Sequence, residues 1–195
     1  MTASKSRRQV LAWLTALALL LLLAGAGAQA DPRVTRIDPV VRDGMLHIDA
    51  DVHFDLNDQL RDAAERGLTL YFTADVVITR SRWYWFDEEV VNAQMTRRIV
   101  YNALTRQWRV GGEELSLPVA TLAEAMATVS NVRGWAVAPI DRFEPDTEYQ
   151  GQFRLRLDTS QLARPFQVNA LNSSSWSPAT NWADFSFSVR AGAQQ

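Results

Sequence analysis

The sequence Phe143-Glu-Pro-Asp-Thr-Glu-Tyr149 leads directly into Gln150-Gly-Gln-Phe-Arg-Leu-Arg-Leu157. In the second stretch, polar and apolar side chains alternate, which is typical of a β-strand with one buried face. The first stretch places a proline, a threonine and a tyrosine at every second position just before that strand. Together they predict a sharp connection that leads into an amphipathic strand.

The spacing of Pro145, Thr147 and Tyr149 is also found where the chain crosses between the two sheets of fibronectin-III-like domains. There the tyrosine hydroxyl bonds to nearby backbone and holds the crossing, an arrangement called a tyrosine corner. The strand after Tyr149 would then be strand F, and residues 184–189 would be strand G. We predict a structural corner at these three residues; the alternative is an ordinary turn before a strand.

Strand patterns outnumber helix patterns in the rest of the chain. They predict strands over residues 46–54, 68–78, 90–101, 107–110, 135–140 and 185–189. Asn57 caps one short helix that Gly67 ends, and a capping box of Thr121 and Glu124 opens another that Gly134 ends. About seven strands with two short helical insertions predict a mainly all-β fold, an immunoglobulin/fibronectin-III-like β-sandwich.

Residues 1–30 have the layout of an export signal. Lys5, Arg7 and Arg8 precede an apolar run, and Ala28-Gln29-Ala30 closes it. We expect cleavage after Ala30, which leaves residues 31–195 as a single β-sandwich domain in the periplasm. The alternative is an uncleaved N-terminal anchor in the inner membrane, with the domain outside the cytoplasm. Contact with a membrane is expected only through this segment, if it is not cleaved.

The composition excludes several classes of function. The chain contains no cysteine, so disulfides, thiolate catalysis and cysteine-ligated zinc are absent. Because the three basic residues named above belong to the leader, the remaining chain carries 17 basic against 22 acidic side chains. This acidic balance argues against nucleic-acid binding, which needs a basic stripe to meet the phosphates.

One strand presents residues that could bind a metal. Over residues 45–55, His and Asp alternate with apolar side chains on one face, namely His47, Asp49, Asp51, His53 and Asp55. A metal-binding protein or metal-dependent hydrolase using this face is one alternative. However, His47 and His53 would lie about 20 Å apart, too far to share an ion. The other interpretation is a solvated edge strand whose carboxylates prevent pairing. No nucleophile motif accompanies these residues, so we expect no enzyme and assign no catalytic, cofactor or metal residue.

Aromatic residues give the strongest indication of binding. Arg82, Trp83, Tyr84, Trp85 and Phe86 would place large rings on both faces of one segment, which a half-exposed strand does not need. We predict that these five residues bind a protein partner. The alternatives are a glycan or small-molecule binder using Trp83 and Trp85, and an internal stack of rings and arginines.

Tryptophans near the C-terminus and several arginines suggest such stacking. Trp176 and Trp182 precede the last strand in a placement similar to the tryptophan-serine element of receptor fibronectin-III domains. The arginines expected to stack on tryptophans are Arg82, Arg97, Arg106 and Arg109.

The motif Trp83-Tyr-Trp-Phe-Asp-Glu-Glu89 has three companions: Tyr101-Asn-Ala-Leu-Thr-Arg-Gln107, Leu157-Asp-x-Ser-Gln-Leu162 and Pro165-Phe-Gln-Val-Asn-Ala170. With them the chain resembles an exported proteobacterial family known only as a domain of unknown function. The resemblance covers the chain after the leader and brings no catalytic residues. Some relatives are encoded beside sensor kinases of the nitrogen-regulation type, which implies an accessory of a membrane sensor. We therefore expect a non-enzymatic periplasmic interaction domain with an envelope protein as partner.

Overall fold

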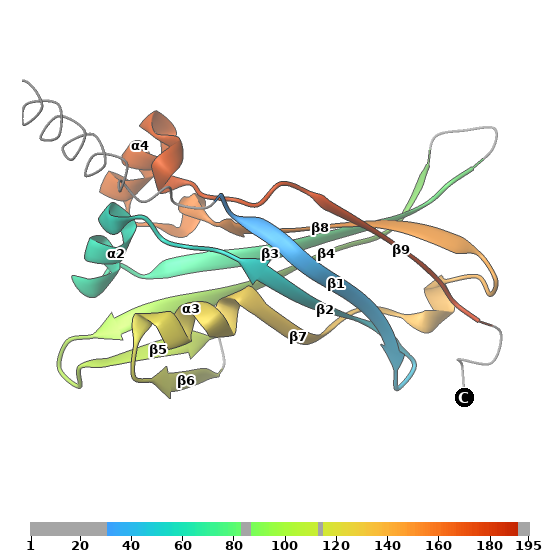
Figure 1. Cartoon of the computed structure of the whole chain (residues 1–195), viewed down its shortest axis with the longest axis horizontal. Coiled ribbons are helices and arrows are strands. Elements are labelled where there is room, and N and C mark those ends of the chain that lie inside the picture. Colours follow the sequence, from blue (N-terminus) through green and yellow to red (C-terminus); the bar gives the residue numbers. More distant parts are fainter. Residues whose placement is uncertain (1–30, 83–86, 113–114, 191–195) are drawn as a thin grey trace, which may run out of the picture. The chain divides into compact units, whose positions relative to one another are not determined.

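The computed structural model describes residues 31–82, 87–112 and 115–190, apart from the side chains of residues 169, 171, 172 and 174. Its strands form two antiparallel sheets, with the orders β1-β2-β7 and β6-β5-β4-β3-β8-β9 (Figure 1). The strands are β1 (Arg33–Arg42), β2 (Met45–His53), β3 (Leu70–Arg80), β4 (Glu88–Asn102), β5 (Gln107–Gly111), β6 (Ser116–Val119), β7 (Asn131–Pro139), β8 (Glu148–Leu157) and β9 (Ala183–Ser188). The helices are α2 (Asp58–Glu65), α3 (Leu122–Ser130) and α4 (Arg164–Asn172), with short 3-10 turns η1 (Ile140–Arg142), η2 (Thr159–Gln161) and η3 (Ser174–Trp176).

The order of the strands is that of an immunoglobulin-like domain, in which A, B and E share one sheet and C, F and G the other. β1, β2 and β7 occupy the positions of A, B and E, while β3, β8 and β9 occupy those of C, F and G. β4, β5 and β6 extend the larger sheet beside β3, on the edge where variable-type domains carry C′ and C″. The prediction of an all-β sandwich with short helical insertions is confirmed.

The core lies between the sheets, because alternate side chains of each strand point inward. The buried positions include Leu46, Ile48, Ala50 and Val52 on β2, Phe72, Ala74, Val76 and Ile78 on β3, and Phe153, Leu155 and Leu157 on β8. Each large apolar side chain contributes about 1.5–3 kcal/mol when it is fully buried. This core stabilises the domain without any disulfide, since the chain has no cysteine.

Helix α3 covers a part of the larger sheet. It packs on β5, where Trp108 and Val110 are buried, and Val129 is buried on the helix. The helix begins at the predicted capping box, because the Glu124 N–H donates to Thr121 Oγ1 at 3.1 Å. The second predicted cap is confirmed in the same way on α2, where Asn57 accepts from the backbone of the first turn.

Two details of the sequence interpretation are wrong. Helix α3 ends at Ser130, not at Gly134, which lies inside β7 with φ +60°. Pairing with β2 recruits residues 131–134 into a strand, and the glycine sits where the β2–β7 register shifts. The strand over residues 45–55 is not an edge strand either, because β2 pairs with β1 on one side and β7 on the other.

Three elements have no counterpart among the predicted ones. β1 contains Pro39 and a break in register between Val34 and Arg36, which disturb its alternation. β6 is only four residues long, and α4 begins after Ala163 without a side-chain cap. Among the residues that the structure describes, no helix has the length and apolar character needed to cross a membrane.

Candidate functional site

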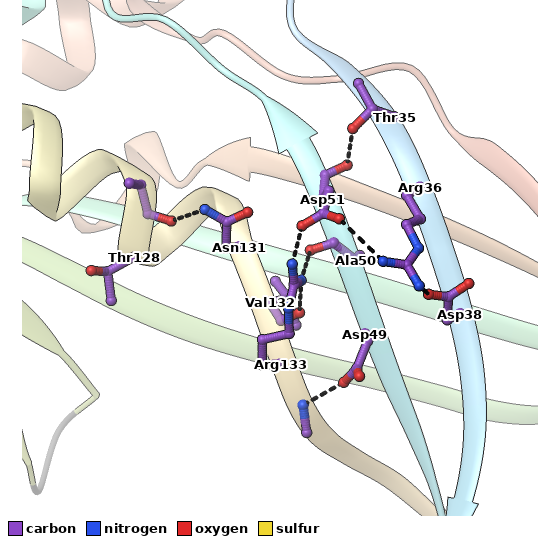
Figure 2. Close-up of polar contacts among 12 residues, drawn as sticks. Thr35, Arg36, Asp38, Asp49, Ala50, Asp51, Thr128, Asn131, Val132 and Arg133 are labelled. Atoms are coloured by element: carbon purple, nitrogen blue, oxygen red, sulfur yellow. Dashed lines mark hydrogen bonds and ion pairs between the residues drawn. The ribbon is translucent and has the colours of Figure 1, made fainter.

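The outward side chains of β1, β2 and β7 form a charged face (Figure 2). Asp49 accepts hydrogen bonds from the Gly134 N–H at 2.6 Å and from Arg42 at 3.1 Å. Asp51 pairs with Arg133, which follows the helix α3 on the neighbouring strand. Three separate strands therefore contribute to the pairing of two carboxylates.

Backbone contacts hold this charged face in place. The Arg133 guanidinium also donates to the carbonyl oxygens of Ala50 at 3.0 Å and Val132 at 2.7 Å. Arg36 on β1 pairs with Asp38 and lies 4.0 Å from Asp51. Because each carboxylate meets at least one arginine, the face is an alternation of opposite charges rather than an acidic cluster.

The pKa of Asp49 lies below its ordinary value of 3.8. The hydrogen bond from the Gly134 backbone is the largest cause; burial opposes it, and the Arg42 charge adds to it. The ionised carboxylate of Asp49 is thus stabilised by the protein itself, without any metal ion.

The two histidines of β2 contact other groups and not Asp49 or Asp51. His53 Nε2 lies 3.2 Å from Asp55, and His47 Nδ1 lies 3.3 Å from the Met45 carbonyl oxygen. Within the described residues, no group of three or more His, Asp or Glu side chains is arranged to hold a metal ion. On the face considered as an alternative metal site, Asp49 and Asp51 instead form ion pairs, and Asp49 accepts a backbone hydrogen bond.

The predicted partner-binding segment lies between β3 and β4. Of its residues, Trp83, Tyr84, Trp85 and Phe86 lie outside the described residues, and Arg82 is described. Arg82 pairs with Glu88, the first residue of β4.

Four side chains form what we call the corner network: Arg80, Arg82, Glu88 and Glu144. Arg80 donates to Glu88 at 2.6 Å and pairs with Glu144. Hydrogen bonds from Arg80 and then Arg82 lower the pKa of Glu88. The network thereby connects the facing ends of β3 and β4 to the chain that precedes β8.

That chain is the stretch from which the sequence analysis began. The buried Tyr149 hydroxyl accepts a hydrogen bond from the Glu144 N–H at 2.8 Å. The Phe143 ring packs edge-on against Tyr149 at 5.0 Å, and Thr147 Oγ1 donates to the Pro145 carbonyl oxygen at 3.4 Å. This arrangement has the geometry of a tyrosine corner, and its backbone carries Glu144 into the corner network.

A second polar cluster, which sequence reasoning missed, lies on the outer face of the larger sheet. Asp75 on β3 is 3% exposed, and its Oδ2 accepts from Arg154 at 2.7 Å and Arg156 at 2.9 Å. Its Oδ1 is buried and has no hydrogen-bond partner in the described part of the chain. Trp182 stacks on the Arg154 guanidinium at 4.3 Å. In the sequence, the one indication of this cluster was Asp75 within the mainly apolar β3, together with the alternating Arg154 and Arg156 of β8.

A pocket of about 820 Å³ lies at the end of the sandwich where α2 and α4 are found (Figure 1). Its wall comes from α2, from the loop before β3, from η2 and from the α4–η3 region. The sequence analysis did not predict it, because α4 was not expected and the pocket joins segments about 100 residues apart.

These observations define an immunoglobulin-like two-sheet domain with a tyrosine corner, a widened larger sheet and extensively paired surface charges. The chain belongs to the family of the domain of unknown function DUF4390, whose sequence model matches residues 29–186. No curated protein and no solved structure matches the chain.

Proposed function

We propose that this chain is a non-enzymatic interaction domain exported to the cell envelope, where it binds another envelope protein. The proposed binding element is the segment Arg82, Trp83, Tyr84, Trp85 and Phe86. The observation that carries the proposal is the corner network, which ties Arg82 at the start of this segment to Glu88, two residues beyond its end.

Recognition residues are often found on loops that a rigid scaffold positions, as at the ends of immunoglobulin sandwiches. Tryptophan, tyrosine and arginine are the residue types enriched at the energetic centres of protein interfaces. A segment with fixed ends loses less conformational entropy on binding, so more of the contact energy appears as affinity. The corner network supplies such fixed ends through ion pairs on both sides of the segment.

The surface beside the segment offers room for a partner's side chain. A small pocket of about 250 Å³ is lined by residues of the corner network, by Arg142 and by Tyr149. It combines arginines and glutamates beside a buried aromatic ring, so it suits a polar or charged side chain.

The proposed location follows from the residue pattern of 1–30, and the proposed partner class follows from the family resemblance. In this proposal the leader is removed and the domain acts in the periplasm; with an uncleaved leader it acts at the outer side of the inner membrane. The partner is proposed to be the outer part of a membrane sensor. The metal-dependent alternative has less support, because Asp49 and Asp51 are paired with arginines.

Photo-crosslinking in living cells tests the interaction. The photoreactive residue p-benzoylphenylalanine is placed at position 85 of the full chain, and at position 104 as a control. The β4–β5 hairpin lies at the opposite end of β4 from Glu88 (Figure 1), and its Leu104 is 97% exposed. We expect a discrete crosslinked envelope protein from position 85 only; equal adducts from both positions, or none from position 85, would contradict the proposal.

Export is tested separately by sequencing the N-terminus of the native product. The expected first residue is Asp31, in the periplasmic fraction. A cytosolic product that retains Met1 would contradict the proposed location without bearing on the interaction itself.

A further inference from the structure

We propose that the pocket between α2 and α4 is a binding site for a neutral sugar. The pocket lies at the helical end of the sandwich, whereas the corner network lies at the other end (Figure 1). This inference therefore does not depend on the proposed interaction function. Its lining residues with chemistry for binding are Gln59, Asp62, Arg66, Tyr71, Phe166 and Trp176.

One wall of the pocket carries an oriented pair of aromatic rings. Phe166 and Trp176 stack with ring centroids 5.6 Å apart and an interplanar angle of 28°. The Trp176 indole N–H donates to Gln59 Oε1 at 2.9 Å, which sets the plane of the indole against α2. Such a ring offers a large apolar area at little cost in conformational entropy. A sugar ring has a C–H face that packs on a surface of this kind.

The pocket wall also carries a pair of opposite charges. Asp62 lies on α2 and Arg66 follows its last turn, so they are four residues apart on the same side of the helix. Within the described residues, neither side chain forms an ion pair or a hydrogen bond, and both are exposed. Both therefore remain available to a ligand.

These charges select for a neutral ligand that carries several hydroxyl groups. A hydroxyl both donates and accepts hydrogen bonds, so neighbouring hydroxyls can use the Asp62 carboxylate and the Arg66 guanidinium together. An anion would be attracted by Arg66 and repelled by Asp62, and a cation the reverse, so a ligand with a net charge gains little from this pair. A purely apolar ligand would leave both charged groups without partners as they lose water.

The volume of the pocket also suits a small ligand. Ligand pockets typically measure about 300–1,000 Å³, and this one measures about 820 Å³. It is thus large enough for a short oligosaccharide. Tyr71 near the start of β3 and Gln161 of η2, just after β8, also line the pocket, so the site joins one end of the central strands to the helical cap.

Isothermal titration calorimetry on the full mature chain tests the proposal, with maltotriose, cellotriose and triacetylchitotriose as probes. We expect at least one of them to bind with a Kd of about 1 mM or below. Trp176→Ala and Arg66→Ala should each weaken that binding at least tenfold. The matched controls are Trp182→Ala, on the outer face of the larger sheet, and Arg109→Ala, on β5; both should bind as the wild type does.

Three results would overturn the proposal. The first is no binding of any of the three sugars at concentrations about tenfold above the expected Kd. The second is sugar binding that neither pocket variant weakens, which would place the sugar elsewhere. The third is binding of laurate or benzoate in the pocket in preference to the sugars. If Trp176→Ala proves unfolded by circular dichroism, Arg66→Ala decides, because that side chain is exposed and supports no observed contact.

Discussion

The Tyr149 hydroxyl accepts a hydrogen bond from the backbone N–H of Glu144, 2.8 Å away across the connection that leads into β8. The carboxylate of the same Glu144 pairs with Arg80 at the end of β3. One residue therefore joins the tyrosine corner to the base of the segment that we propose as the binding element. The corner therefore lies directly beside the surface that we propose as the binding element.

Replacing Tyr149 by phenylalanine removes this acceptor while keeping the packing of the ring. The partly buried hydrogen bond from the Glu144 N–H would be lost, so we expect the free energy of unfolding to fall by about 1 kcal/mol. Urea denaturation measures the change. Tyr101→Phe is the control, because its ring packs on Trp108 at 4.9 Å and its hydroxyl makes no hydrogen bond in the described structure. Equal effects of the two substitutions would contradict a special role of the corner.

A close approach of β8 to β9 makes Gly151 sensitive to a methyl group. A Cβ atom there would lie 2.2 Å from Cζ of Phe185, so the ring would have to move. We expect Gly151→Ala to destabilise the domain by about 1–3 kcal/mol through overpacking. Gly112→Ala is the control, since a Cβ atom at that position meets nothing within 4 Å. An unchanged urea midpoint for Gly151→Ala would refute this contact.

The lowered pKa of Asp49 predicts a specific dependence of stability on pH. A carboxyl group whose pKa is lower in the folded state stabilises the fold above its unfolded pKa, and this contribution disappears as the pH falls through the folded pKa. The stabilisation is thus complete at neutral pH and is lost progressively below about pH 4.

Thermal melts of Asp49→Asn between neutral and acidic pH test this prediction. The variant should be less stable than the wild type at pH 7, and the difference should shrink as the pH falls. Asp43→Asn, in the β1–β2 turn, is the control, because Asp43 makes no side-chain contact in the described structure. A constant difference for Asp49→Asn across the whole range would show that its charge is not responsible.

Because Asp75 is buried, we expect the loss of its charge to lower the free energy of unfolding substantially. Asp75→Asn would leave Arg154 and Arg156 facing each other without their shared carboxylate. Removing one member of a fully buried pair costs about 3–5 kcal/mol. We expect about 2–3 kcal/mol here, because both guanidinium groups are partly exposed.

Asp184→Asn is the matched control for this experiment. Asp184 is exposed on the same face of the sheet and accepts a hydrogen bond from Gln152 at 2.8 Å. Its replacement should change the unfolding free energy by less than about 0.5 kcal/mol. Equal unfolding free energies for the two variants would contradict a stabilising role of the cluster around Asp75.

The stacking of arginine on tryptophan could not be predicted correctly from the sequence. Arg97 was expected to stack, but it points into the core side of β4, where its guanidinium donates to the Thr128 carbonyl oxygen at 2.7 Å. Burial lowers the pKa of Arg97. Among the described residues, the structure shows an arginine stacked on a tryptophan between Arg154 and Trp182. Pairing β8 with the segment before β9 decides this contact, and no local pattern encodes that pairing.

Local patterns alone determined the strands with regular alternation, the two helix caps and the position of the corner. These features depend on neighbours within a few residues, so the chain itself specifies them. The burial pattern of β2 is one example, since its apolar residues are buried at every second position as the sequence predicts.

Only the tertiary structure decided what the polar side chains do. Asp49 meets the backbone of a residue 85 positions later in the chain, and Asp51 pairs with an arginine 82 positions later. These contacts show that the carboxylates of β2, which alone could bind a metal, form ion pairs and a backbone hydrogen bond. In the same way, the pocket exists only because α2 and α4 lie next to each other in the fold. Electrostatic and hydrogen-bond contacts act through space and not along the chain. The partner of a charged side chain therefore depends on the register of the sheet and on the path of the loops.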